Sequence, residues 1–310
     1  MEQIQRLIAN IEKVVFGKHE VVKLCVVGLI ARGHLLIEDV PGIGKTTIAH
    51  GIARSLDCKF NRIQFTSDML PSDILGVSVL DPKINDFVFR KGPIFASIVL
   101  ADEVNRTPPK TQSALLEAMS EYQISMDGIT YPLPRPFMVI ATQNPIEYEG
   151  TYILPESQLD RFMLRVEIGY PPPEDEIRIM RRHHSHKAVG ALEAALSTEE
   201  LLKLQDEVSN ITVDDSVAEY ILTIIQGTRS HPQVQLGVSP RGSLSLYECC
   251  QARALVEGRD YVTPDDVKRM AVPVLAHRIL VKSKGMDLAT SARERVRLIE
   301  EIVNNVIVPV

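Results

Sequence analysis

The amino-acid sequence predicts an α/β domain built on a parallel sheet, followed by an all-helical domain. Short apolar runs alternate with helical patterns as far as residue 170, and a glycine-rich loop separates the first such run from a helix. After three consecutive prolines at 171–173, the remaining chain has almost only helical patterns. Because alternating strands and helices form parallel sheets covered on both faces, these observations favour a two-domain α/β protein.

Two amphipathic helices open the chain, with apolar faces at 4–11 and 21–29. Five buried-strand candidates follow, at 34–38, 59–65, 97–101, 137–142 and 162–168, and the segment 109–121 has a helical pattern.

Two segments interrupt this alternation and read as hairpins. Residues 76–89 (GVSVLDPKINDFVF) place Pro, Asn and Asp between two short β-like runs. Residues 123–133 carry Asp127-Gly128 between alternating runs, which is a strong hairpin signal.

The prolines at 171–173 can continue neither a strand ladder nor a helix, so we expect a core domain over 1–170 and a helical domain over 171–310. Helix starts in the second part are marked by Ser197 with Glu200, by Ser239-Pro240 and by Thr263-Pro264.

Composition excludes several classes of protein. The 310 residues hold 34 Lys+Arg and 40 Asp+Glu, a formal charge of −6, with 5% aromatic residues and no Trp, which argues against a nucleic-acid binder. The four cysteines include no CxxC pair, so we expect reduced thiols rather than a metal site. The apolar runs are shorter than the ~20 residues of a membrane span. We therefore expect a cytoplasmic protein that does not insert into membranes.

The strongest local motif lies between the first predicted strand and the next helix. The candidate phosphate-binding residues are Pro41, Gly42, Ile43, Gly44, Lys45, Thr46 and Thr47. Glycines let backbone N–H groups approach phosphates, a lysine neutralises their charge and the Thr46 hydroxyl can hold Mg²⁺. A full P-loop has its first glycine where this chain has Asp39, whose carboxylate would repel phosphate unless it turns away.

Polar residues end two further strand candidates. Asp102 is expected to help hold Mg²⁺, and Glu103 to polarise a water for attack on the γ-phosphate. Asn144 follows the next strand and is expected to orient that water, although Asn-Pro is by itself more often the start of a turn. No Asn-Lys-x-Asp guanine signature occurs, which favours ATP over GTP.

These strings and several others occur in a characteristic order. They are GIGKT at 42–46, LADEVNR at 100–106, PPKTQ at 108–112, ALLEAM at 114–119, ATQNP at 141–145, LPE at 154–156, LDRF at 159–162 and SPR at 239–241. Together they closely resemble the MoxR family of AAA+ ATPases over nearly the whole chain.

The resemblance implies an AAA+ P-loop ATPase core with a helical lid, in which the two hairpins are the helix-2 insert and the pre-sensor hairpin. It implies catalytic roles for Glu103, for Asn144 as sensor 1, for Arg161 as the arginine finger and for Arg241 as the sensor 2 arginine. Whether Arg241 serves its own subunit or a neighbour stays open, and so does a local Asp160–Arg161 ion pair.

The resemblance further implies ATP and Mg²⁺, a homo-oligomeric ring that we expect to be a hexamer, and a von Willebrand factor A domain partner. The expected activity is ATP hydrolysis coupled to remodelling, chaperone-like maturation or metal-cofactor insertion of a protein client. One alternative is a nucleic-acid translocase, which the absence of Lys and Arg from residues 123–133 disfavours. The other is an ATP-gated scaffold with negligible turnover, for which Asp39 is the one sequence indication.

Overall fold

The computed structural model describes residues 2–40, 42–144, 152–182, 190–282 and 288–309. Its core is a parallel five-stranded sheet of order β2-β5-β8-β1-β9, so the predicted α/β fold is confirmed. The strands are β1 (Leu35–Glu38), β2 (Phe60–Gln64), β5 (Ile98–Asp102), β8 (Met138–Gln143) and β9 (Leu164–Val166). Since the strands are parallel, their carboxyl ends share one edge of the sheet, where ligands of such sheets bind.

Both faces of the sheet are buried, which explains the continuous apolar runs. Leu35 and Ile37 of β1 face one cluster, together with residues of α1 (Glu2–Glu12), α2 (His19–Ile30) and α3 (Lys45–Ser55). Leu36, between them, belongs to a second cluster with residues of α4 (Pro71–Leu75) and α5 (Pro109–Glu121). Successive strand residues point to opposite faces, so one short run supplies both layers.

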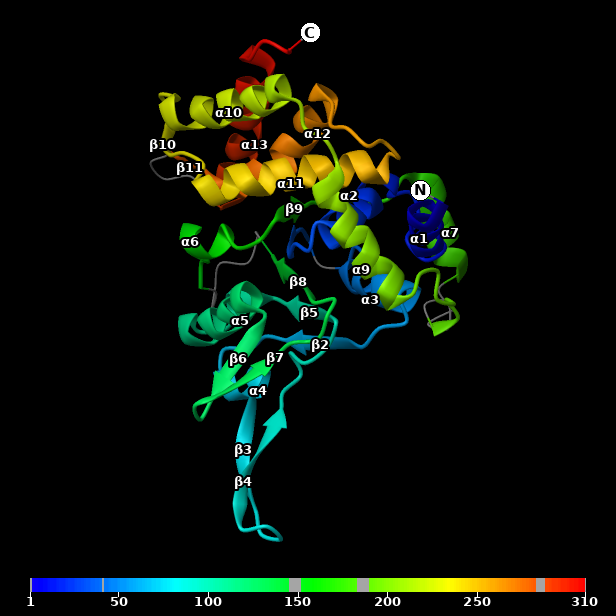
Figure 1. The fold of residues 1–310 in the computed structure, drawn as a ribbon, viewed down its shortest axis with the longest axis vertical. Helices are drawn as coiled ribbons and strands as arrows, with labels where there is room; N and C mark the ends of the chain where they lie inside the picture. The colour runs from blue at the N-terminus through cyan, green and yellow to red at the C-terminus, as the bar shows by residue number, and fades with distance from the viewer. Residues whose placement is uncertain (1, 41, 145–151, 183–189, 283–287, 310) are drawn as a thin grey trace.

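Two antiparallel hairpins extend from the core. The first pairs β3 (Gly76–Asp81) with β4 (Asp86–Lys91) and projects from the end of the molecule opposite the C-terminal helices (Figure 1). The second pairs β6 (Gln123–Met126) with β7 (Ile129–Pro132) around Asp127 and Gly128, both at positive φ. Phe89 stacks on Tyr131 with ring centroids 4.4 Å apart, so the two hairpins lie against each other.

The C-terminal part is a helical lid, as predicted. The helices that follow the sheet are α7 (Pro173–Arg182), α9 (Thr198–Glu207), α10 (Asp215–Ser230), α11 (Pro240–Val256), α12 (Pro264–Leu275) and α13 (Leu288–Asn305). Ser197 and Ser239 accept hydrogen bonds from the backbone of Glu200 and Gly242, so two of the three predicted caps form in this way, and Thr263 is the N-cap residue of α12. A short ribbon of β10 (Val234–Leu236) and β11 (Leu280–Val281) was not expected, because its pairing joins distant segments too short to show a strand pattern.

The remaining described elements are short helical turns, namely α6 (Glu156–Leu159) and the 3-10 helices η1 (Val104–Arg106), η2 (Val208–Asn210) and η3 (Ala276–Arg278). Of these, η1 follows Glu103 and η3 ends at Arg278.

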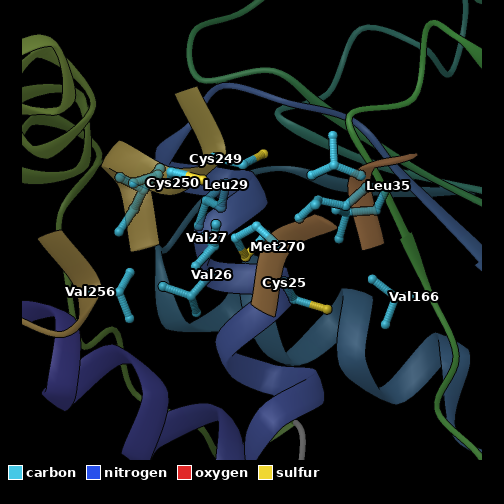
Figure 2. Packing of buried hydrophobic residues seen from close by; sticks show 14 of the residues in the cluster. Cys25, Val26, Val27, Leu29, Leu35, Val166, Cys249, Cys250, Val256 and Met270 are labelled. Atoms are coloured by element: carbon cyan, nitrogen blue, oxygen red, sulfur yellow. The ribbon is translucent and has the colours of Figure 1, made fainter. Parts of the chain in front are cut away.

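Core and lid share one hydrophobic cluster (Figure 2). Cys25 of α2 lies in this cluster with Leu35 and Val166 of the sheet and with Cys249 and Met270 of the lid. All four cysteines are free thiols, and burial raises the pKa of Cys25 to about 12, so this thiol stays protonated. Among the described residues, no group of His, Cys, Asp and Glu could hold a metal ion through three such ligands, and no helix is long and apolar enough to cross a membrane.

Candidate active site

The glycine-rich loop of residues 39–44, named the phosphate loop below for its predicted ligand, connects β1 to α3. Gly42 and Gly44 have φ values of +86° and +96°, a region that L-residues rarely adopt. Apart from its chain neighbours, a Cβ at either position would meet no heavy atom of the described residues within 4 Å, which leaves room for a ligand beside both glycines. Lys45 begins α3, where unpaired helix N–H groups attract phosphate, and its ammonium group donates to the Asp39 carbonyl. Pro41 lies outside the described residues.

The Asp39 carboxylate faces the backbone of its neighbours. Oδ2 accepts hydrogen bonds from the N–H groups of Ile168 and Gly169, at 2.8 and 2.7 Å, and Oδ1 accepts one from Val40 at 2.8 Å. The side chain is thereby held on the segment that leads from β9 into the lid. Asp39 therefore anchors the loop, and its charge is balanced by three N–H donors.

Residues suited to Mg²⁺ lie on α3 and β5. Thr46 and Thr47 occupy the first turn of α3 and are half-buried. Asp102 ends β5, and its Oδ1 accepts a hydrogen bond from the Thr142 hydroxyl at 2.6 Å. A carboxylate oxygen with one such bond keeps a further lone pair, and hydroxyl and carboxylate oxygens are the ligands that Mg²⁺ prefers. Thr46 and Asp102 therefore supply oxygen atoms of the kind that hold Mg²⁺.

Glu103 is held by contacts on several sides. Its backbone lies in the left-handed region with φ 60°, which costs roughly 1–2 kcal/mol for a residue with a Cβ. The Glu103 N–H donates to the Thr142 hydroxyl at 2.9 Å, and Oε2 accepts from Gln64 Nε2 at 2.8 Å. Arg106 Nε lies 3.1 Å from the same oxygen. A strained backbone fixed by its surroundings is typical of a functional position, and a carboxylate held here can act as a base.

Asn144 directly follows β8 and is 7% exposed. Strand β8 pairs with both β1 and β5, with Gln143 opposite Glu38 and Ala141 opposite Ala101. The amide of Asn144 thus lies at the sheet edge between the strand that leads into the phosphate loop and the strand that ends in Asp102.

Arg161 and Arg241 line the same groove, of about 420 Å³. Arg161 Nη1 donates to the Leu116 carbonyl and to Ser120 Oγ of α5, both at 2.7 Å. Arg241 lies in the first turn of α11 and is exposed. No described residue of the phosphate loop lines this groove, and neither does Asp102 or Glu103.

Sequence reasoning missed three residues that position the carboxylates: Arg62, Gln64 and Thr142. The guanidinium group of Arg62 contacts Asp102 Oδ2 at 2.6 Å, while Gln64 stands opposite Asp102 in the β2–β5 register and reaches Glu103. Polar residues within the apolar strand 59–65 were the available signal. That signal acquires meaning only once β2 is known to pair with β5.

The fold agrees with comparisons to known proteins. Residues 34–164 match the ATPase family associated with various cellular activities (AAA), and residues 226–302 match the AAA lid domain. A crystal structure of a Cytophaga hutchinsonii protein superposes with a TM-score of 0.88 at 36% identity, covering 100% of this chain and 96% of that one.

Sequence relatives extend over most of the chain. The Bacillus subtilis protein YeaC is 48% identical over 98% of this chain and 94% of its own length. Chaperone MoxR1 of Mycobacterium tuberculosis is 41% identical over 90% of this chain and 76% of its own length. Protein MoxR of Methylorubrum extorquens is 28% identical over 88% of this chain and 86% of its own length. With its α/β core, helical lid and relatives of this kind, the chain belongs to the MoxR family of AAA ATPases.

Proposed function

We propose that this protein hydrolyses ATP in an oligomeric ring and uses the energy to remodel a protein client. The observation that carries the proposal is the fixed position of Glu103 at the sheet edge, beside Asp102 and two strands from β1, which leads into the phosphate loop. Lys45 and the loop amides bind the phosphates of ATP. Thr46 and Asp102 hold Mg²⁺, which neutralises phosphate charge. Glu103 polarises the attacking water, and Asn144 orients it.

The groove that Arg161 and Arg241 share is the observation in favour of an oligomeric ring. The groove that both arginines line includes no described residue of the phosphate loop of the same subunit, which favours action on the nucleotide of a neighbour. An arginine supplied across an interface stabilises charge on the transferring phosphoryl group, worth roughly 10³–10⁵ in rate in GTPases. We propose that both act in trans, and that the ring is a hexamer.

The first hairpin, β3–β4, is the observation in favour of a protein client. Val77, Leu80, Ile84 and Phe87 are between 48% and 68% exposed on this projecting ribbon, a concentration of apolar surface that is unusual outside interaction sites. The name of the relative chaperone MoxR1 is in keeping with such a client. We include a von Willebrand factor A domain protein as partner, on the family resemblance, and a reducing, cytoplasmic setting, supported by the four free thiols.

The alternatives have less support. Residues 123–133, the segment of the second hairpin, contain no Lys or Arg to contact phosphates of a nucleic acid. An ATP-gated scaffold was suggested by Asp39, but its carboxylate is satisfied by three backbone donors.

The test is ATP turnover per subunit measured over a range of protein concentrations. We expect turnover to rise as rings assemble and to be lost in Glu103→Gln, which should still bind ATP. Glu199→Gln, an exposed position on α9, is the matched control and should behave as the wild type. Tight ATP binding by the wild type without turnover would contradict the proposal and favour the scaffold.

A further inference from the structure

A buried arginine of the lid holds the segment that carries Arg161. Arg278 ends η3, and its side chain is 1% exposed. The guanidinium group donates to the carbonyls of Met163 and Phe162, at 3.1 and 2.7 Å, and Nε donates to Asp160 Oδ1 at 2.9 Å. Further contacts tie it to lid residues, namely the Val274 carbonyl, His277 and Ser245.

Asp160 is the point where two parts of the lid meet the core. While Oδ1 accepts from Arg278, Oδ2 accepts from the Ser239 hydroxyl at 3.0 Å. Ser239 caps α11 and stands two residues before Arg241, and Asp160 directly precedes Arg161. One carboxylate thus connects the backbone of Arg161, the helix start that carries Arg241 and the buried Arg278.

The chemistry of arginine suits this connection. A guanidinium group carries five donors in a fixed plane, so it can hold several carbonyls in one geometry, whereas a lysine ammonium is a point charge on a flexible stem. A buried arginine is costly unless paired, and here Asp160 supplies the charge and the carbonyls of Asp160, Phe162 and Met163 supply acceptors. These bonds tie the backbone of the segment to the lid, while the Arg161 guanidinium group contacts α5 of the core.

We propose that Arg278 is a positioning residue that makes the Arg161 segment move with the lid, so that lid orientation sets both Arg161 and Arg241 against the neighbour's nucleotide. This inference rests on the proposed action of these arginines in trans. Arg278 would then serve the next subunit's site while leaving its own phosphate loop unaffected.

Mixed rings test this directly. Arg278→Lys keeps the charge but loses the planar set of donors. We expect turnover to fall by about tenfold or more, since a small misplacement of a catalytic group lowers the rate by up to ~10²-fold. The Kd for ATP should stay within about twofold of the wild type. Adding Glu103→Gln subunits, which have an inactive site but an intact Arg161 segment, should restore turnover. At equal amounts, random assembly gives about half of the Arg278→Lys sites a competent neighbour.

The same mixture made with Arg161→Ala separates the two proposals. If Arg161→Ala is rescued by Glu103→Gln and Arg278→Lys is not, Arg278 does not act through the neighbour's site and the inference is wrong. If Arg161→Ala is not rescued either, the trans arrangement itself fails. Asp160→Asn, which weakens the same connection from the core side, should be rescued like Arg278→Lys and serves if the lysine variant does not fold.

Discussion

Replacing Asp39 with alanine removes the anchor between the phosphate loop and the segment leading into the lid. The carboxylate is 8% exposed and accepts three backbone hydrogen bonds. One donor belongs to Ile168, which is 4% exposed, while Val40 and Gly169 are half-buried. After the substitution, water can reach the two half-buried N–H groups more readily than that of Ile168.

The expected loss follows from these three bonds. A hydrogen bond to a charged group contributes about 1.5–3 kcal/mol, and a buried donor left unsatisfied costs about 1–3 kcal/mol. Counting the Ile168 bond in full and the other two at a fraction, the free energy of unfolding should fall by about 2–4 kcal/mol. Asp39→Gly restores the glycine of the usual P-loop but removes the same acceptors, so it should be at least as destabilising. Asp39→Asn, which keeps one carbonyl oxygen, should lie between.

Urea unfolding of the three variants measures this. The control is Asp265→Ala, because Asp265 forms a surface pair with Arg269 at 68% exposure and should cost under about 1 kcal/mol. ATP affinity should also fall, by about tenfold, because phosphate would have to order a loosened loop. An Asp39→Gly protein as stable as the wild type, with unchanged ATP affinity, would show that the loop needs no anchor and would refute the reasoning.

Three further predictions concern stability and the site. Burial lowers the pKa of His34 from 6.5 to about 4. Between pH 4 and pH 6.5 the unfolded chain therefore binds a proton at His34 and the folded one does not. The free energy of unfolding is then unaffected above pH 6.5 and falls at lower pH by about 1.4 kcal/mol per unit, or about 2 kcal/mol at pH 5. His34→Gln should remove this pH dependence from urea unfolding curves. Gly44→Ala, at φ +96°, should destabilise by about 1 kcal/mol and weaken ATP binding measured by calorimetry. Arg62→Ala removes a cation that would compete with Mg²⁺ for Asp102, so it should change stability by under about 1 kcal/mol but lower the Mg²⁺ concentration for half-maximal turnover. An unchanged Mg²⁺ concentration for half-maximal turnover would contradict this competition.

Much of the fold could be predicted because its signals are local. The strand runs, the glycine-rich loop before α3 and the cap residues Ser197 and Ser239 each act within a few neighbours in the chain. The same holds for Asp102 and Glu103, since an apolar run that ends in carboxylates marks a strand end. The short β10–β11 ribbon had no such local signal, because its two strands are brought together by the lid.

By itself, the sequence predicted the family, the order of most elements and the residues that we propose to bind phosphate and Mg²⁺, because these predictions depend on residue type and short spacing. Only the tertiary structure decided that Asp39 turns from the loop to Ile168, that Gln64 holds Glu103, and that Arg161 and Arg241 line one groove. The contact between Arg278 and Asp160 was likewise decided only by the tertiary structure. Each of these contacts joins residues that lie far apart in the chain, so the partner exists only after strand order and lid packing have brought the two together.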